Sequence, residues 1–330
     1  MTLAPGRRRA VTAALEVPSL ETTVGSVHLR NPVMTASGTA GHGAELAAYC
    51  DLSSLGAVVV KSVSRQSWSG NPAPRLWPLP TGMLNSVGLQ NAGVEQWLAE
   101  DLPALAATGA TVVASIWGFS ATDYRSVAEV IAAAVADGRA PGVVAVEANI
   151  SCPNVEDRRQ MFAHSCHGVG EAIGAAANGL GSALPLWAKL SPNVTDLPSL
   201  AGAAQEAGAE AVTLINTVMG MALDPLDGGF RLGAGGGGLS GPAIHPVAVR
   251  AVYEVRAAWP HLPIVGVGGV SSGIDAAELI AAGADAVQVG TASFAEPAAT
   301  IRILAELSRW MAGHGITSVA ALKGRGHDHS

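Results

Sequence analysis

Lysine is nearly missing from this sequence. Of the 19 basic residues among 330, only Lys61, Lys189 and Lys323 are lysine, and the others are arginine. Lys61 and Lys189 each come directly after an apolar run. Because a compact ammonium and a planar guanidinium fork are not interchangeable, we expect these two lysines to have functional roles. Chance is the alternative explanation.

Cysteine is scarce as well. The three cysteines, Cys50, Cys152 and Cys166, form neither a CxxC pair nor any metal-ligand spacing. The sequence therefore offers no visible way for this chain alone to hold an iron–sulfur cluster, and we predict no metal site. For Cys50 and Cys166 we favour a structural or incidental role.

Long hydrophobic runs and basic stripes are also lacking. Apolar residues make up 49% of the chain, but no apolar run is long enough to cross a membrane. The net charge is −7, and no stripe of basic residues is present that could neutralise phosphates. Both observations argue against a nucleic-acid partner. The apolar stretch after residues 7–9 is too short for a secretory signal. We expect residues 1–20 to be a flexible tail, residues 21–330 to form a single domain, and the protein to be cytoplasmic.

Short β-type runs alternate with Ala- and Leu-rich helical stretches, which is typical of repeated βα units. Strands are predicted at residues 33–36, 57–61, 111–116, 143–149, 186–190, 211–215, 263–267 and 286–289. Helices are predicted at residues 93–108, 126–137, 168–178, 199–208, 246–259, 274–283 and 297–313. This α/β pattern favours a closed (β/α)₈ TIM barrel over an open doubly wound sheet. The long Gly- and Pro-rich stretches 64–91 and 219–241 should overhang the C-terminal mouth of the strands.

Polar residues stand where six of the predicted strands end. They are Ser37, Lys61, Ser115, Asn149, Lys189 and Asn216. A cap or turn is the ordinary role of a single serine or asparagine in such a place. In a barrel, however, these positions converge on one cavity, so six of them together favour a common site.

A cysteine lies among three of the amides. Asn149, Asn154 and Asn216 offer both acceptors and donors, which suits a flat ligand whose rim alternates carbonyls and N–H groups, such as a pyrimidine. Cys152 is a candidate proton acceptor, because a suitable environment makes the thiolate available; an inert buried thiol is the alternative. We therefore predict redox or acid–base chemistry on a small planar ring.

Glycines follow the last two predicted strands. Gly268 and Gly269 come after the seventh strand, and Gly290 and Thr291 after the eighth. Glycines allow backbone N–H groups to approach an anion closely, and barrels commonly bind phosphate in these two loops. Tight turns are the alternative explanation, but the position in the strand order favours a phosphate site. Gly241, at the end of a glycine run, could add a backbone donor.

Taken together, these strings resemble dihydroorotate dehydrogenase. The matching strings are NISCPN at 149–154, MLNSVGLQN at 83–91, KLSPNVTD at 189–196, INTVMGMA at 215–222, GGLSGPAI at 237–244, and VGVGGV at 265–270 through GTASF at 290–294. The resemblance extends from residue 24 to residue 318. Cysteine at position 152 resembles class 1, and the motifs are most similar to the class 1B catalytic subunit.

The resemblance implies an FMN enzyme that oxidises (S)-dihydroorotate to orotate in de novo pyrimidine biosynthesis. Cys152 would be the general base at C5, while the C6 hydrogen would pass as hydride to N5 of the flavin. The implied substrate-binding residues are Lys61, Asn85, Ser86, Val87, Gly88, Leu89, Asn149, Asn154, Asn216 and Thr217. The implied FMN-binding residues are Ser37, Lys61, Ser62, Ser115, Asn149, Lys189, Ile215, Gly241, Gly268, Gly269, Gly290 and Thr291.

Two of these residues have a more specific implied role. Lys189 would stabilise the charge that develops at the N1/O2 edge of the flavin. Ser115 departs from the family, which usually has asparagine there; loss of one neutral hydrogen bond costs about 1 kcal/mol.

Class 1B further implies a separate subunit with FAD and a [2Fe–2S] cluster, NAD⁺ as the final acceptor, and a homodimeric core. Fumarate is the acceptor in class 1A. Three other functions remain open: a flavin oxidoreductase acting on uracil-type dihydropyrimidines, a phosphate-binding TIM-barrel lyase with Lys189 as a Schiff base, and a non-catalytic subunit.

Overall fold

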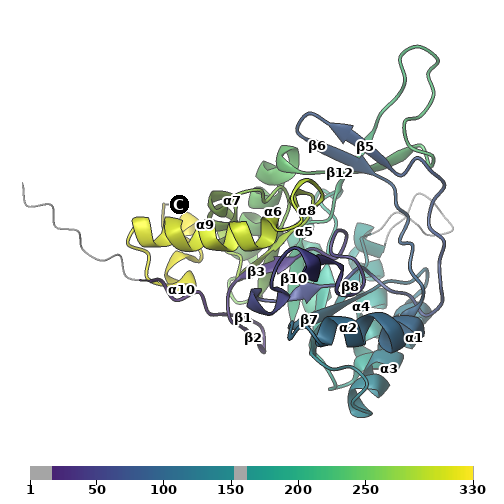
Figure 1. Ribbon diagram of the computed structural model, residues 1–330, viewed down its shortest axis with the longest axis horizontal. Helices are drawn as coiled ribbons and strands as arrows, with labels where there is room; N and C mark the ends of the chain where they lie inside the picture. The colour runs from purple at the N-terminus through teal and green to yellow at the C-terminus, as the bar shows by residue number, and fades with distance from the viewer. Residues whose placement is uncertain (1–16, 152–161, 330) are drawn as a thin grey trace, which may run out of the picture.

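A closed barrel of parallel strands forms the centre of the molecule. The computed structural model describes residues 17–151 and 162–329 (Figure 1). Eight strands are hydrogen-bonded in the order β3-β14-β13-β10-β9-β8-β7-β4. They are β3 (Val33–Thr35), β4 (Val58–Val59), β7 (Val112–Ile116), β8 (Val143–Asn149), β9 (Leu186–Lys189), β10 (Ala211–Leu214), β13 (Ile264–Val267) and β14 (Ala286–Val289). A parallel bridge between Met34 and Ala57 joins the two ends, so the predicted TIM barrel is confirmed.

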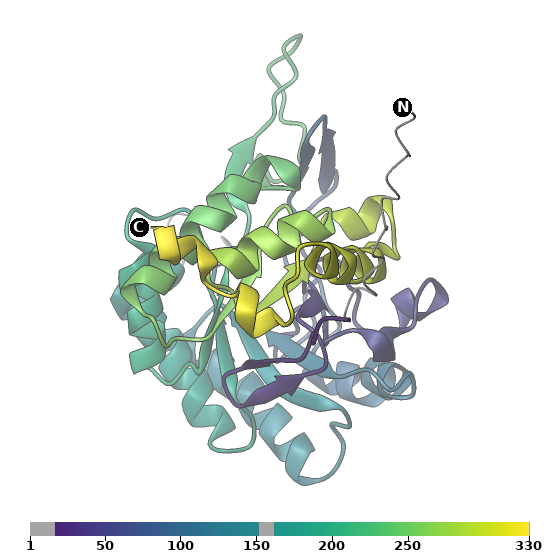
Figure 2. The same ribbon diagram turned by 90° about the vertical axis from the view of Figure 1, so that its left-hand side faces the viewer.

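Helices surround the strands (Figure 2). They are α1 (Val94–Gln96), α2 (Leu102–Ala106), α3 (Ala121–Ala136), α4 (Cys166–Leu180), α5 (Leu197–Glu206), α6 (His245–Ala258), α7 (Gly273–Ala282), α8 (Ala292–Ala295), α9 (Ala299–Gly313) and α10 (Val319–Leu322). A π-helical turn, Trp97–Asp101, joins α1 to α2. Helices α3 and α4 begin earlier than predicted, because Ser120 and Ser165 accept a hydrogen bond from a backbone N–H in the first turn and cap them.

The N-terminal part of the described chain covers the end of the barrel at which the strands begin. The hairpin β1 (Thr22–Val24) and β2 (Val27–Leu29) packs its apolar side chains against interior residues such as Trp187. Residues 1–16 of the expected tail lie outside the described residues. From Ser19 onwards the chain is fixed, since the Ser19 N–H donates to the Thr317 carbonyl at 2.9 Å.

The two long Gly- and Pro-rich stretches pair with each other. The first contributes β5 (Leu76–Leu79) and β6 (Gly82–Asn85), and the second contributes β11 (Val218–Met221) and β12 (Gly236–Ser240). These strands form an antiparallel sheet in the order β11-β12-β6-β5 that extends beyond the barrel (Figures 1 and 2). The prediction that both stretches overhang the mouth is confirmed. Within the described ranges, no helix is long and apolar enough to cross a membrane.

Candidate functional site

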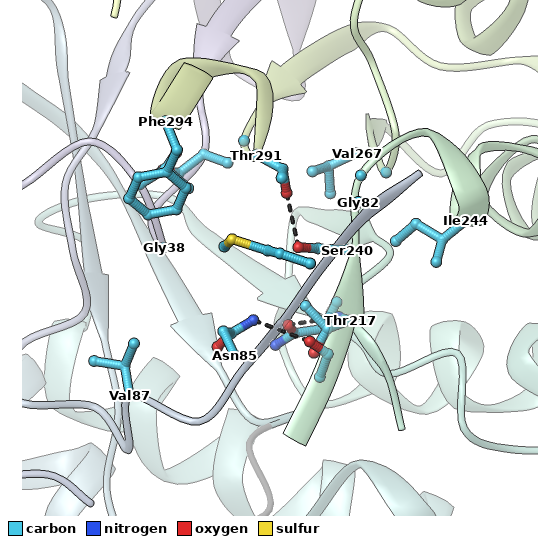
Figure 3. A pocket seen from close by; sticks show the side chains of 18 of the residues that line it. Gly38, Gly82, Asn85, Val87, Thr217, Ser240, Ile244, Val267, Thr291 and Phe294 are labelled. Carbon is cyan, nitrogen blue, oxygen red and sulfur yellow. Dashed lines mark hydrogen bonds between the residues drawn. The ribbon is translucent and has the colours of Figure 1, made fainter. Parts of the chain in front are cut away.

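A cavity of about 820 Å³ lies between the barrel mouth and the antiparallel sheet. Figure 3 shows part of its lining, with Asn85 and Thr217 on one side and Thr291 and Ser240 on the other. The predicted site residues that line it are Ser37, Lys61, Ser62, Asn85, Ser86, Val87, Gly88, Leu89, Asn149, Lys189, Ile215, Asn216, Thr217, Gly241, Gly268, Gly269, Gly290 and Thr291. Cys152 and Asn154 lie outside the described residues.

Ser115 is the one described member of the predicted set that does not line the cavity. Its side chain is fully buried, and its hydroxyl lies 2.8 Å from the hydroxyl of Ser62. Ser62 itself lines the cavity and accepts a hydrogen bond from the Asn149 amide at 3.3 Å. The short Ser115 side chain therefore supports the wall through Ser62.

The ends of β8 and β10 carry a hydrogen-bonded group of polar side chains. The side-chain oxygen of Asn149 accepts from the Asn216 amide at 3.2 Å and from the Ser151 hydroxyl at 3.1 Å. A buried phenol, Tyr124, donates to the backbone carbonyl of Asn149 at 2.7 Å. These bonds fix the orientation of both amides in the cavity wall.

Lys189 supplies a positive charge to the same wall. The side chain follows from the end of β9, is almost fully buried, and donates to the Ser37 hydroxyl at 3.3 Å. Lys61 lines the cavity as well. The cavity thus has ammonium groups and amides at one end, an arrangement suited to a planar ring with polar edges and partial negative charge.

The segment Ser86–Leu89 is held in shape by residues that the sequence analysis did not identify. Trp68 donates from its indole nitrogen to the Gly88 carbonyl at 3.0 Å, and Asn71 donates to the Ser86 hydroxyl at 2.8 Å. Leu89 has a φ of 61°, unusual for a residue with a side chain. No local pattern marks Trp68 or Asn71, because their partners lie 15 to 20 residues further along the chain.

Glycines form the other end of the cavity. A Cβ at Gly269, where φ is 68°, would lie 2.7 Å from the Cβ of His245 and 2.9 Å from the Gly241 carbonyl. The nearby hydroxyls of Thr291 and Ser240 are 2.8 Å apart (Figure 3). His245, which the sequence analysis missed, holds this loop: its Nδ1 lies 2.8 Å from the Gly268 carbonyl. Glycine backbone and hydroxyls of this kind suit an anionic group.

The cavity therefore offers three different environments to one elongated ligand. Amides and lysines lie at one end and glycine backbone with hydroxyls at the other, where the apolar side chains of Ile215, Val267 and Ile244 also line the cavity, next to Gly268. This donor set fits a polar planar ring with an anionic tail. Among the described residues, no group of three or more His, Cys, Asp or Glu side chains could hold a metal ion.

Comparison with known proteins agrees with this geometry. Residues 19–311 match the family model described as "Dihydroorotate dehydrogenase". A relative from Geobacter sp. (strain M21), "Dihydroorotate dehydrogenase B (NAD(+)), catalytic subunit", is 44% identical over 94% of this chain and 99% of its own. One with the same description, from Geotalea daltonii, is 43% identical over 93% of this chain and 98% of its own. A "Putative dihydroorotate dehydrogenase A (fumarate)" from Solibacter usitatus is also 43% identical, with the same coverage. The resemblance predicted from the motifs is confirmed, and the chain belongs to the dihydroorotate dehydrogenase family.

Proposed function

We propose that this protein is a class 1B catalytic subunit that oxidises dihydroorotate to orotate with FMN. The observation that carries the proposal is the convergence on one cavity of the implied substrate and flavin residues, Ser115 excepted, among those the structure describes. The family match and the catalytic-subunit description of two relatives support the same activity.

The cavity provides a suitable environment for each part of FMN. Lys189, Ser37 and Lys61 would hold the polar ring edge, and the backbone of Gly268 and Gly269 would hold the phosphate. The glycine loop supports this assignment, because Gly268 and Gly269 line the cavity with positive φ, so that no side chain keeps a ligand away from their backbone N–H groups. When bound, FMN supplies an acceptor for the hydride that leaves C6 of dihydroorotate.

The substrate would lie against the amide group described above. Asn149 and Asn216 fix one another, and their bonds leave one N–H of Asn149 and one acceptor position of the Asn216 oxygen, which would pair with a pyrimidine ring. Thr217 and the Asn85–Leu89 segment, together with Asn154, would complete the contacts to the ring and its carboxylate. Cys152 would act as the general base that accepts the proton from C5 of the substrate.

Electrons would leave through a partner. We propose a separate subunit with FAD and a [2Fe–2S] cluster, with NAD⁺ as the final acceptor and a homodimer of this chain at the core of the assembly. The catalytic-subunit description of two relatives supports the partner. The lack of a cluster-binding cysteine pattern in the sequence agrees with the partner, and it agrees equally with a fumarate-linked enzyme. Because one relative is described as a fumarate-type enzyme, fumarate is the alternative acceptor to compare with NAD⁺. A cytoplasmic location remains a prediction.

The first experiment is anaerobic reduction of the purified protein. We expect a yellow protein with one FMN per chain that bleaches when dihydroorotate is added. Dihydrouracil, which lacks the carboxylate, should bleach it far more slowly; a faster reaction with dihydrouracil would favour the uracil-type enzyme. Colourless protein that cannot be reconstituted with FMN would refute the proposal. Co-purification from the host, followed by iron and FAD assays, tests the partner.

A further inference from the structure

A carboxylate is buried inside the barrel, directly behind the cavity wall. Glu147 lies on β8, two residues before Asn149, and its exposed fraction is 0%. Its Oε2 accepts hydrogen bonds from the Thr213 hydroxyl at 2.9 Å and from the Gln288 amide at 2.7 Å. Two donors therefore converge on one oxygen of this carboxylate.

The second oxygen of this carboxylate has no hydrogen-bond donor in the described part of the chain. Oε1 of Glu147 is buried, and the group that faces it is the Lys189 ammonium, with Nζ at 3.9 Å. A buried charge without compensation is costly, so this ion pair is what balances Glu147. Lys189 thus lies between a carboxylate on its barrel side and the cavity on the other.

The geometry points to Glu147 as a positioning residue for the flavin reaction: a buried counter-charge that orients Lys189 and lowers the reduction potential of the bound FMN. The inference rests on the proposed function. Reduction adds negative charge to the ring, and the nearby carboxylate opposes it while the ammonium favours it. Because both side chains are almost fully buried, neither water nor salt screens this effect strongly.

The ion pair explains a feature of the sequence that the cavity alone does not. Glu147 interrupts the apolar strand 143–149, where a hydrophobic residue would pack without a charge. A purely structural role for Glu147 is the competing explanation. It predicts a change in stability but no change in the potential of the flavin, so the potential separates the two.

The test is the reduction potential of FMN bound to Glu147→Gln, measured by equilibration with a reference dye. We expect the equilibrium to shift at least tenfold toward reduced FMN, which for a two-electron couple is about 30 mV more positive. The matched control is Asp285→Asn. Asp285 is also a buried carboxylate in ion pairs, with Arg256 and Lys323, but it lies before the first residue of β14, at the opposite end of the strands from the cavity. The reduction potential of FMN bound to Asp285→Asn should equal that of FMN bound to the parent protein.

A second variant provides the test if Glu147→Gln does not fold. Thr213→Val keeps the shape of the side chain but removes one of the two donors to the Glu147 carboxylate, so the potential of the bound FMN should differ measurably from that of the parent. A potential for Glu147→Gln equal to that of the control, or more negative, would overturn the inference, as would an unchanged potential in Thr213→Val. If the inference fails in this way but the parent protein binds FMN and is reduced by dihydroorotate, the proposed function still stands. Parent protein that does not take up FMN refutes both.

Discussion

The Asn216 amide donates to the side-chain oxygen of Asn149 at 3.2 Å, although the two residues are 67 positions apart. The same amide donates to the Ser151 hydroxyl at 2.6 Å, and its own oxygen accepts from the Thr217 N–H at 2.7 Å. Asn216 therefore uses both ends of its amide to fix the ends of β8 and β10. The orientation of the proposed substrate site depends on this pair.

Replacing Asn216 with alanine should weaken orotate binding. The change removes the donor to Asn149 and Ser151 and leaves the Thr217 N–H without its acceptor. A lost partner of this kind costs about 1–3 kcal/mol, which is about fivefold in affinity at the low end. FMN content should not change. Titration of the flavin spectrum with orotate measures the affinity, and Asn178→Ala, on the exposed surface of α4, is the control. Equal affinities in the two variants would contradict the role of Asn216.

Lys189→Met should slow flavin reduction by dihydroorotate by about 10²-fold, because a fixed charge aimed at a developing charge typically contributes on that scale. Rapid-mixing absorbance under anaerobic conditions measures the rate at saturating substrate. Lys323→Met is the control, since Lys323 pairs with Asp285, which does not line the cavity. If flavin reduction in Lys189→Met is within a few-fold of the control rate, Lys189 does not contribute to the reaction.

Cys152→Ser should retain FMN but lose turnover at neutral pH by about 10²-fold or more, because a hydroxyl is a poor general base. Steady-state turnover with an artificial acceptor measures the effect, and flavin content is read from the spectrum. Cys166→Ser, at the exposed start of α4, is the matched control and should behave like the parent. Near-normal flavin reduction in Cys152→Ser would refute the general-base assignment.

Gly269→Ala should prevent FMN retention. The added Cβ would lie 2.9 Å from the Gly241 carbonyl and 2.7 Å from the Cβ of His245, in a loop that we assign to the phosphate. Gly138→Ala is a close control: its φ of 70° gives similar backbone strain, but nothing lies within 4 Å of the new Cβ. Both variants should lose about 1–2 kcal/mol of stability from the left-handed backbone, and Gly269→Ala should lose more, because two protein atoms lie closer than 3.0 Å to its new Cβ. Only Gly269→Ala should lose FMN, as measured after gel filtration; retention at the parent level would argue against the phosphate site.

Asp275→Asn should reveal a pH-dependent contribution to stability near the same loop. Burial alone raises the pKa of the Asp275 carboxyl, but hydrogen bonds from Ser271 and Ser272 outweigh burial and lower it. A carboxyl whose folded pKa is depressed stabilises the fold above its unfolded pKa, about 4, and loses that contribution as the pH falls through the folded pKa.

At pH 7 the variant should therefore unfold up to about 1 kcal/mol more easily, because asparagine keeps one acceptor oxygen for Ser271 and Ser272 but loses the negative charge at the start of α7. The gap should begin to narrow below about pH 4, where the carboxyl of the unfolded chain takes up a proton, and should close as the pH falls through the lower folded pKa. Urea unfolding of both proteins at pH 7 and at pH 3 measures it. A gap of the same size at both values would show that the charge of Asp275 does not contribute.

Much of the fold follows from local patterns. Apolar runs of four to seven residues, separated by helical stretches, predicted all eight barrel strands, because a buried parallel strand needs little more than a continuous apolar sequence. The chemistry at the strand ends was equally visible, since Asn149 and Lys189 each end a strand. Helix starts were less accurate, because a serine cap such as Ser120 can begin a helix before the apolar period becomes clear.

Other features arise only from contacts between distant segments. Nothing local to Trp68 indicates that it holds Gly88, and an apolar strand pattern does not indicate that Glu147 faces inward toward Lys189. Ser115 lies one residue before the end of β7, close to the strand end as predicted, yet its side chain lies behind Ser62.

The sequence by itself determined the strands, their order along the chain and the polar groups that end them, because each depends on neighbouring residues. Only the tertiary structure decided which of those groups share the cavity and which support it from behind. The physical reason is closure of the barrel, which brings β3 beside β4 and β14 and gives each side chain partners far away in the sequence.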